Sequence, residues 1–225
     1  MLKRGTGRRV WLAVAITALA VMAYTGFALA ASLPIVGQID DTYTAATYSI
    51  DQGEVAQLQV SGSDHNATAH QNGPDGRALF RSPTISGGAA PVDGTQYLAA
   101  GDYTFFCTIH PTTMQATLHV TANGTPQARP SATAKVRTKK ISRALKGLMV
   151  AITASAKIDG ATVTAKLGKA TIGRATAELF AGAQTVRLKL SKAGKSKLTK
   201  KSSAKVGVTV EIPFGTPATA KANLR

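Results

Sequence analysis

Apolar residues alternate with polar or charged residues in several segments of the second half of the chain. In QTVRLKLS, Val186, Leu188 and Leu190 are separated by Arg187 and Lys189, and the segments GLMVAITAS and KVGVTVEI repeat the pattern. Successive side chains of a β-strand point to opposite faces of its sheet, so a period of two indicates antiparallel strands with one buried face. The pattern argues against a disordered basic tail, although blocks of like charge are often disordered.

The first half also favours strands, which are separated by turn residues. The segments TYTAATYSI and GEVAQLQV flank Asp51-Gln52-Gly53, and a turn-rich passage follows from Ser61 to about Gly94. The segments QYLAAGDYTFFC and QATLHVTA come after this passage. Strands divided by Gly, Asp and Pro, with no convincing helical period, predict a small antiparallel sandwich. The expected fold class is therefore all-β, with two successive sandwiches.

The charge of the chain changes where its composition changes. The segment ANGTPQARPSATA, residues 122–134, has the Pro, Gly and Ser content of a linker. Residues 31–126 carry two basic and eight acidic residues, whereas residues 127–225 carry 21 basic and three acidic residues. We therefore predict two domains of opposite charge, at 31–121 and 135–225.

The N-terminal segment is typical of a secretory signal. Four basic residues precede an uncharged apolar run, which ends with the small residues Ala28 and Ala30. This pattern predicts a signal peptide over 1–30, with cleavage before Ala31. The alternative is an uncleaved membrane anchor, because no residue from Val10 to Gln38 is charged and about 20 apolar residues can span a bilayer. Either prediction places the rest of the chain outside the cytoplasm, as a secreted, periplasmic or wall-associated protein.

The single cysteine, Cys107, lies close to His110 and Met114 in the segment YTFFCTIHPTTM. A lone thiol in an oxidising compartment calls for burial, pairing with another chain or a bound metal. Thiolate, imidazole and a weak thioether form the ligand set that suits copper in both oxidation states. The spacing therefore predicts three of four copper ligands. The alternatives are a buried free thiol for Cys107 and core packing for Met114.

The motif GDYTFFC, followed by TIHP and Met114, resembles the copper loop of the cupredoxins, the plastocyanin and azurin family. The resemblance covers roughly residues 43–121. The family takes its remaining histidine from an upstream loop, often written His-Asn, and here His65-Asn66 follows Ser63-Asp64. The resemblance implies a Greek-key sandwich with one mononuclear copper ion held by His65, Cys107, His110 and Met114. His70 is the rival to His65 for the upstream position.

The resemblance also assigns supporting residues. Asn66 and Thr108 match positions at which the family joins its two ligand loops by hydrogen bonds. Tyr103 fits the tyrosine corner of Greek-key sandwiches. Three features depart from the family. Three residues separate His110 from Met114, and Ala116 stands where a glycine is usual. The strand before His65 ends QLQVSGSD, without the aromatic residue and the Asn that are usual there. Residues 135–225 resemble the immunoglobulin-like or fibronectin type III-like sandwiches of secreted bacterial proteins.

These features together predict an exported type 1 (blue) copper protein that exchanges single electrons with redox partner proteins of the cell envelope. The chain has four histidines and no His-x-His pair, so it lacks the ligands of a second copper centre and we expect no enzyme. Two alternatives are copper binding or storage without a redox partner, and an envelope-binding module with a vestigial metal site. The basic domain could meet anionic wall polymers or lipid surfaces. Nucleic acid is not an expected partner of an exported protein.

Overall fold

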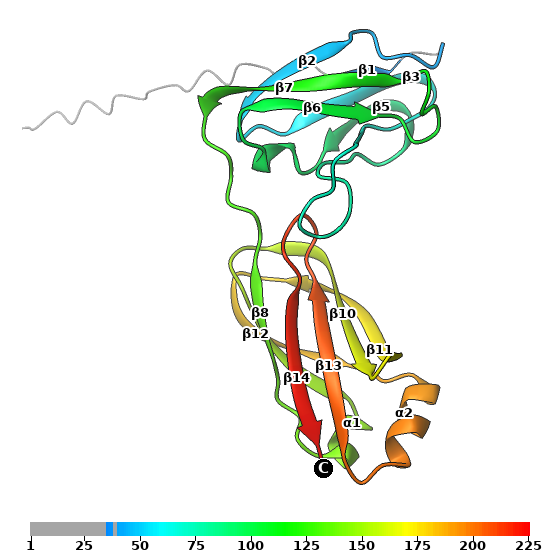
Figure 1. Ribbon diagram of the computed structural model, residues 1–225, viewed down its shortest axis with the longest axis vertical. Helices are drawn as coiled ribbons and strands as arrows, with labels where there is room; N and C mark the ends of the chain where they lie inside the picture. The colour runs from blue at the N-terminus through cyan, green and yellow to red at the C-terminus, as the bar shows by residue number, and fades with distance from the viewer. Residues whose placement is uncertain (1–34, 38–39) are drawn as a thin grey trace, which may run out of the picture. The chain divides into compact units, whose positions relative to one another are not determined.

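The computed structural model describes residues 35–37 and 40–225 (Figure 1). The predicted signal peptide at 1–30 lies outside the described residues, and so does most of the alternative anchor. In the part of the chain that is described, no helix has the length and apolar character needed to cross a bilayer. The described residues belong to one compact unit, Ser32–Arg225. The division into domains on either side of residues 122–134 therefore stays a prediction.

Strands of the first half form two sheets. One has the order β1-β3-β5 and the other the order β2-β7-β6-β4. Their bounds are β1 Ile35–Gly37, β2 Thr47–Gln52, β3 Ala56–His65, β4 Thr68–Ala69, β5 Ile85–Val92, β6 Gly101–Phe106 and β7 Gln115–Gly124. The pairs β1–β3 and β2–β7 are parallel, and the other pairs are antiparallel. A short 3-10 helix, Thr95–Tyr97, precedes β6.

Buried side chains from both sheets form the core of this first sandwich. Alternate residues of β3, namely Ala56, Leu58 and Val60, are buried, and Leu118 of β7 and Phe105 of β6 join them. The ring of Phe105 lies 6.0 Å from the ring of Phe80. Since Phe105 is the penultimate residue of β6, this packing fixes the end of the strand that leads into Cys107.

The passage from Ser61 to Gly94 contains more strand than the sequence predicted. Strand β3 continues to His65, and β5 occupies Ile85–Val92. The pairing of β3 with β5 is irregular between Ser61 and His65, and Gly62 has φ of 100°. A bulge of this kind needs glycine because its backbone lies in the left-handed region. The irregular pairing carries β3 on to His65.

The second half forms two further sheets, in which all pairs are antiparallel. Their orders are β11-β10-β13-β14 and β12-β9-β8. The bounds are β8 Ala132–Val136, β9 Leu148–Ala154, β10 Ile158–Leu167, β11 Ala170–Leu179, β12 Gly182–Leu188, β13 Ala204–Glu211 and β14 Ala218–Leu224. Two short helices are α1, Ile141–Ala144, and α2, Lys192–Thr199. The all-β prediction is confirmed, and the immunoglobulin-like relationship stays a prediction.

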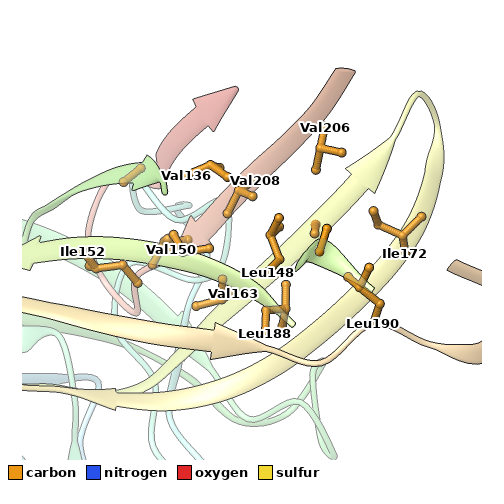
Figure 2. Close-up of a cluster of buried hydrophobic side chains, with 14 of the residues drawn as sticks. Val136, Leu148, Val150, Ile152, Val163, Ile172, Leu188, Leu190, Val206 and Val208 are labelled. Carbon is orange, nitrogen blue, oxygen red and sulfur yellow. The ribbon is translucent and has the colours of Figure 1, made fainter. Parts of the chain in front are cut away.

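Figure 2 shows the apolar core of this second sandwich, in which the side chains of both sheets meet. Leu148, Val150 and Ile152 of β9 are buried, as the alternation predicted. Val206 and Val208 of β13 are buried in the same way. Lys205 of β13 lies on the outer face, where solvent reaches it.

Candidate metal centre

Three of the predicted ligands meet at one end of the first sandwich. One donor atom from each of His65, Cys107 and His110 lies within 4.8 Å of the other two. His65 is the last residue of β3, Cys107 directly follows β6, and His110 lies in the loop before β7. His65 and Cys107 are fully buried, whereas the side chain of His110 is 23% exposed. Two strand ends and one loop therefore build a site that reaches the surface at His110.

The spacing of these donor atoms suits a first-row metal ion. Cys107 Sγ lies 4.0 Å from His110 Nδ1, and the two imidazole rings have centroids 5.1 Å apart. Bonds of about 2.0 Å to nitrogen and 2.3 Å to sulfur would place two donors of one ion roughly 3.5–4 Å apart. One thiolate and two imidazoles are the equatorial donors of a type 1 copper site. The cluster fits that kind of site.

The loop between Cys107 and Met114 is closed by its own backbone. The N–H of Cys107 donates to the carbonyl of Met114 at 3.0 Å, and the N–H of Met114 donates to the carbonyl of His110 at 2.9 Å. Met114 is fully buried. These two hydrogen bonds hold the three residues together despite their separation along the chain. The role of Met114 as the fourth ligand stays a prediction.

Asn66 connects the loop after β3 to the loop after β6. Its Nδ2 donates to Thr108 Oγ1 at 2.7 Å, and its Oδ1 accepts from the Thr108 N–H at 3.0 Å. Nδ2 also donates to Thr84 Oγ1 at 2.9 Å, and Tyr43 donates its hydroxyl to the Asn66 carbonyl at 2.6 Å. Burial raises the pKa of Tyr43 well above its usual range, so this hydroxyl stays protonated and remains a donor. The hydrogen bonds fix residues directly next to His65 and Cys107.

Asp41 also lies at the site, although no feature of the sequence predicted it there. Its Oδ1 lies 3.5 Å from His110 Nε2 and 4.0 Å from His65 Nε2. Ser63 donates its hydroxyl to the same oxygen at 3.2 Å and lies 3.0 Å from His65 Nε2. The carboxylate therefore faces the Nε2 atoms of both imidazoles, while Nδ1 of His110 faces Cys107. The acidic pair Asp40-Asp41 is visible in the sequence, but no spacing rule relates it to the histidines.

The other two histidines lie outside the cluster. His70 is exposed, and its ring stacks on Phe106 with centroids 4.5 Å apart. His119 on β7 has its Nδ1 2.6 Å from Asp102 Oδ1. The geometry therefore places His65, and not His70, beside Cys107. Tyr103 donates its hydroxyl to the carbonyl of Ala99 at 3.0 Å, four residues upstream, as a tyrosine corner does.

No protein-family model matches this chain, and no curated protein matches it either. Among solved structures, amicyanin from Paracoccus versutus is similar, with 24% identity and a TM-score of 0.32 over 39% of this chain and 80% of that one. A purple cupredoxin from Nitrosopumilus maritimus is 18% identical, with a TM-score of 0.32 over 40% of this chain and all of that one. A reduced mutant of amicyanin is 22% identical over 39% and 81%, with a TM-score of 0.32. These neighbours are cupredoxins, and the case for a copper site in this chain rests on the geometry of His65, Cys107 and His110.

Proposed function

We propose that this protein is an exported type 1 copper protein that carries single electrons between proteins of the cell envelope. The observation that supports this function is the buried thiol of Cys107 next to His65 and His110. These three residues would hold the ion, with Met114 as a weak fourth ligand. When bound, copper supplies a one-electron Cu(I)/Cu(II) couple. The export of the protein rests on the N-terminal sequence pattern, and we propose no substrate-transforming activity.

The surrounding residues suit a site that changes oxidation state without rearranging. His65 and Cys107 are buried at the ends of strands, and the hydrogen bonds between Asn66 and Thr108 join their loops. Ligands held in this way keep one geometry, which limits reorganisation when an electron arrives or leaves. His110 is partly exposed and the neighbouring Ile109 is 44% exposed. We infer that a partner protein meets the site at this surface.

The visible spectrum of the copper-loaded protein tests the proposal. Adding one equivalent of Cu(II) to the metal-free protein is expected to produce an intense blue colour, because the Cys107 thiolate donates charge to the metal. Zn(II), which has no accessible redox change, is the control and is expected to give no colour. A protein that stays colourless with Cu(II) would show that the type 1 assignment is wrong.

Redox kinetics separate an electron carrier from a copper store. An electron carrier is expected to be reduced and reoxidised rapidly by proteins from the same envelope fraction. A slow couple with tight retention of Cu(I) would instead favour storage without a redox partner. Stopped-flow absorption of the blue colour measures both rates with the full protein.

Replacing Asp41 by asparagine is expected to raise the reduction potential of the site. A carboxylate beside both imidazoles favours the more positive Cu(II) state, so removing its charge favours Cu(I). The side chain of Asp41 is 43% exposed, so solvent screens much of its effect. We expect a shift of tens of millivolts, below the roughly 59 mV that corresponds to a tenfold change for a one-electron couple. A redox titration of the blue colour gives the value.

Asp40→Asn is the matched control for this substitution, because it removes the same charge from the exposed neighbouring residue. Its shift is expected to be clearly smaller. Equal shifts in the two variants would mean that net charge, and not the position of Asp41 beside the imidazoles, sets the effect.

A further inference from the structure

A strongly basic hollow of about 520 Å³ lies on the outer surface of the second sandwich. Six cationic side chains line it, and all six are exposed. We call it the basic groove, and its cationic residues are Arg137, Lys139, Lys140, Arg143, Lys146 and Arg187. The residues come from the segment directly after β8, from α1 and its flanks, and from β12, whose last residue Leu188 pairs with Leu148 of β9. Helix α1 lies at the end of the sandwich where the chain finishes (Figure 1).

The floor of the basic groove is built by neighbouring strands. Arg187 of β12 is the register partner of Met149 in β9, and the N–H of Arg137 donates to the Met149 carbonyl at 2.8 Å. Leu148 and Leu188, which are adjacent in sequence to these residues, point into the core. Arg137, Met149 and Arg187 therefore lie side by side on the outer face, with two guanidinium groups flanking an exposed thioether.

The rim of the basic groove is held in place by hydrogen bonds. Arg187 Nη2 donates to the carbonyl of Lys146 at 2.7 Å. The Arg187 side chain passes so close to Gly147 that a Cβ at residue 147 would lie 2.6 Å from Arg187 Nε. The N–H of Met149 donates to Thr138 Oγ1 at 2.9 Å, and the N–H of Arg225 donates to the Lys139 carbonyl at 2.9 Å. These contacts order the backbone that carries Lys139, Lys140 and Lys146, which we call the rim lysines.

The acidic residues of this half of the chain are engaged elsewhere. Residues 127–225 contain three of them, which are Asp159, Glu178 and Glu211. Lys157 Nζ lies 3.2 Å from Asp159 and 2.9 Å from Glu178, and Arg174 lies 3.9 Å from Glu211. No acidic side chain is among the residues that line the basic groove. No acidic lining residue neutralises the positive charge of the basic groove, so this charge can attract an anion from outside the chain.

We propose that the basic groove binds a linear phosphate-bearing polymer. Guanidinium groups recognise phosphate oxygens by paired hydrogen bonds, and Arg137 and Arg187 present two such groups on the floor. A phosphate group offers oxygens in several directions, so it can contact floor arginines and rim lysines together. A carboxylate accepts hydrogen bonds mainly in the plane of its two oxygens. The hollow shape suits a chain that enters it. This function goes beyond electron transfer and does not depend on it.

Binding of long-chain inorganic polyphosphate to the full-length protein tests the proposal. The double variant Arg137→Gln/Arg187→Gln is expected to weaken binding by at least about tenfold and to lower the slope of log K against log salt by roughly one to two. The matched control is Lys197→Gln/Lys200→Gln, which removes the same charge from a different lysine-lined hollow on the same sandwich. The affinity of the control variant for polyphosphate is expected to fall by less than about threefold. The blue colour with Cu(II) should be unchanged in both variants, which separates this test from that of the copper site.

Two further variants separate charge from geometry. Arg137→Lys/Arg187→Lys keeps both charges but removes the paired donors, and it is expected to bind more weakly than the unaltered protein. Lys139→Gln/Lys146→Gln changes only the rim and leaves the Arg187 contact with Gly147 in place. Its expected loss of polyphosphate binding therefore tests the basic groove without disturbing the floor.

Three results would overturn the proposal. The first is equal loss of binding in the groove and control variants, which would indicate a diffuse effect of net charge. The second is binding to vesicles containing phosphatidylglycerol with none to polyphosphate, which would indicate a membrane surface as the partner. The third is no binding to polyphosphate at about 50 mM salt, where contacts with phosphate are favoured.

Discussion

Replacing Cys107 by serine is expected to abolish the blue colour of the copper-loaded protein. A serine hydroxyl stays protonated at neutral pH and lacks the polarisable sulfur that donates charge to copper. His65 and His110 remain, so we expect Cu(II) still to bind, but more weakly and without intense visible absorption. Absorption spectra during a Cu(II) titration, combined with competition against a chelator, measure both effects.

The loss of colour must be separated from loss of fold, because Cys107 is fully buried. A buried hydroxyl without a partner costs about 1–3 kcal/mol of unfolding free energy, which thermal unfolding of the metal-free variant would detect. Thr112→Ser, in the same loop but exposed, is the control and is expected to keep both colour and stability. A Cys107→Ser protein that is folded and still blue would show that the thiolate is not a ligand.

Strands with a clear period of two were predictable from the sequence, and strands without it were not. In β9 and β13, apolar side chains face the core at every second position, so the alternation can be recognised in the amino-acid sequence. In β10, Thr162 and Thr164 are buried together with the apolar residues between and beside them. Burial on both faces removes the alternation on which the prediction relies. Strand β5 contains two glycines and Pro91, which mark turns in most contexts but are tolerated on an edge strand.

Some residues of the candidate site were predictable from the sequence and others were not. Cys107, His110 and Met114 are close in sequence, and the chemistry of their side chains alone indicated copper. His65 was identified only through the resemblance to a family, because the amino-acid sequence does not reveal that β3 continues through an irregular pairing to His65. Asp41 could not be found at all. Its place beside both imidazoles depends on tertiary structure that brings its segment back to the ligand loops.

Replacing Asn66 by alanine is expected to weaken both the fold around the site and its affinity for copper. The substitution removes the amide that joins the Thr108 N–H and hydroxyl to the loop of His65, and it also removes a partner of Thr84. Asn66 is buried, so we expect the free energy of unfolding to fall by about 2–3 kcal/mol, the cost of leaving buried polar groups without partners. Copper affinity is expected to fall by about 10–100-fold, as is typical when residues that orient metal ligands are lost.

Denaturant unfolding of the metal-free protein and competition titration with Cu(I) measure these two effects separately. The matched control is Asn123→Ala, because Asn123 is exposed and its side chain bonds only at the surface, to Asp51 at 3.2 Å. Its unfolding free energy is expected to change by no more than about 0.5 kcal/mol. If the two variants behaved alike, the backbone bonds between Cys107, His110 and Met114 would be sufficient to order the ligand loop. A loss of copper affinity without a loss of stability would instead mean that Asn66 acts by orienting His65 and Cys107, since orientation affects the metal and not the metal-free fold.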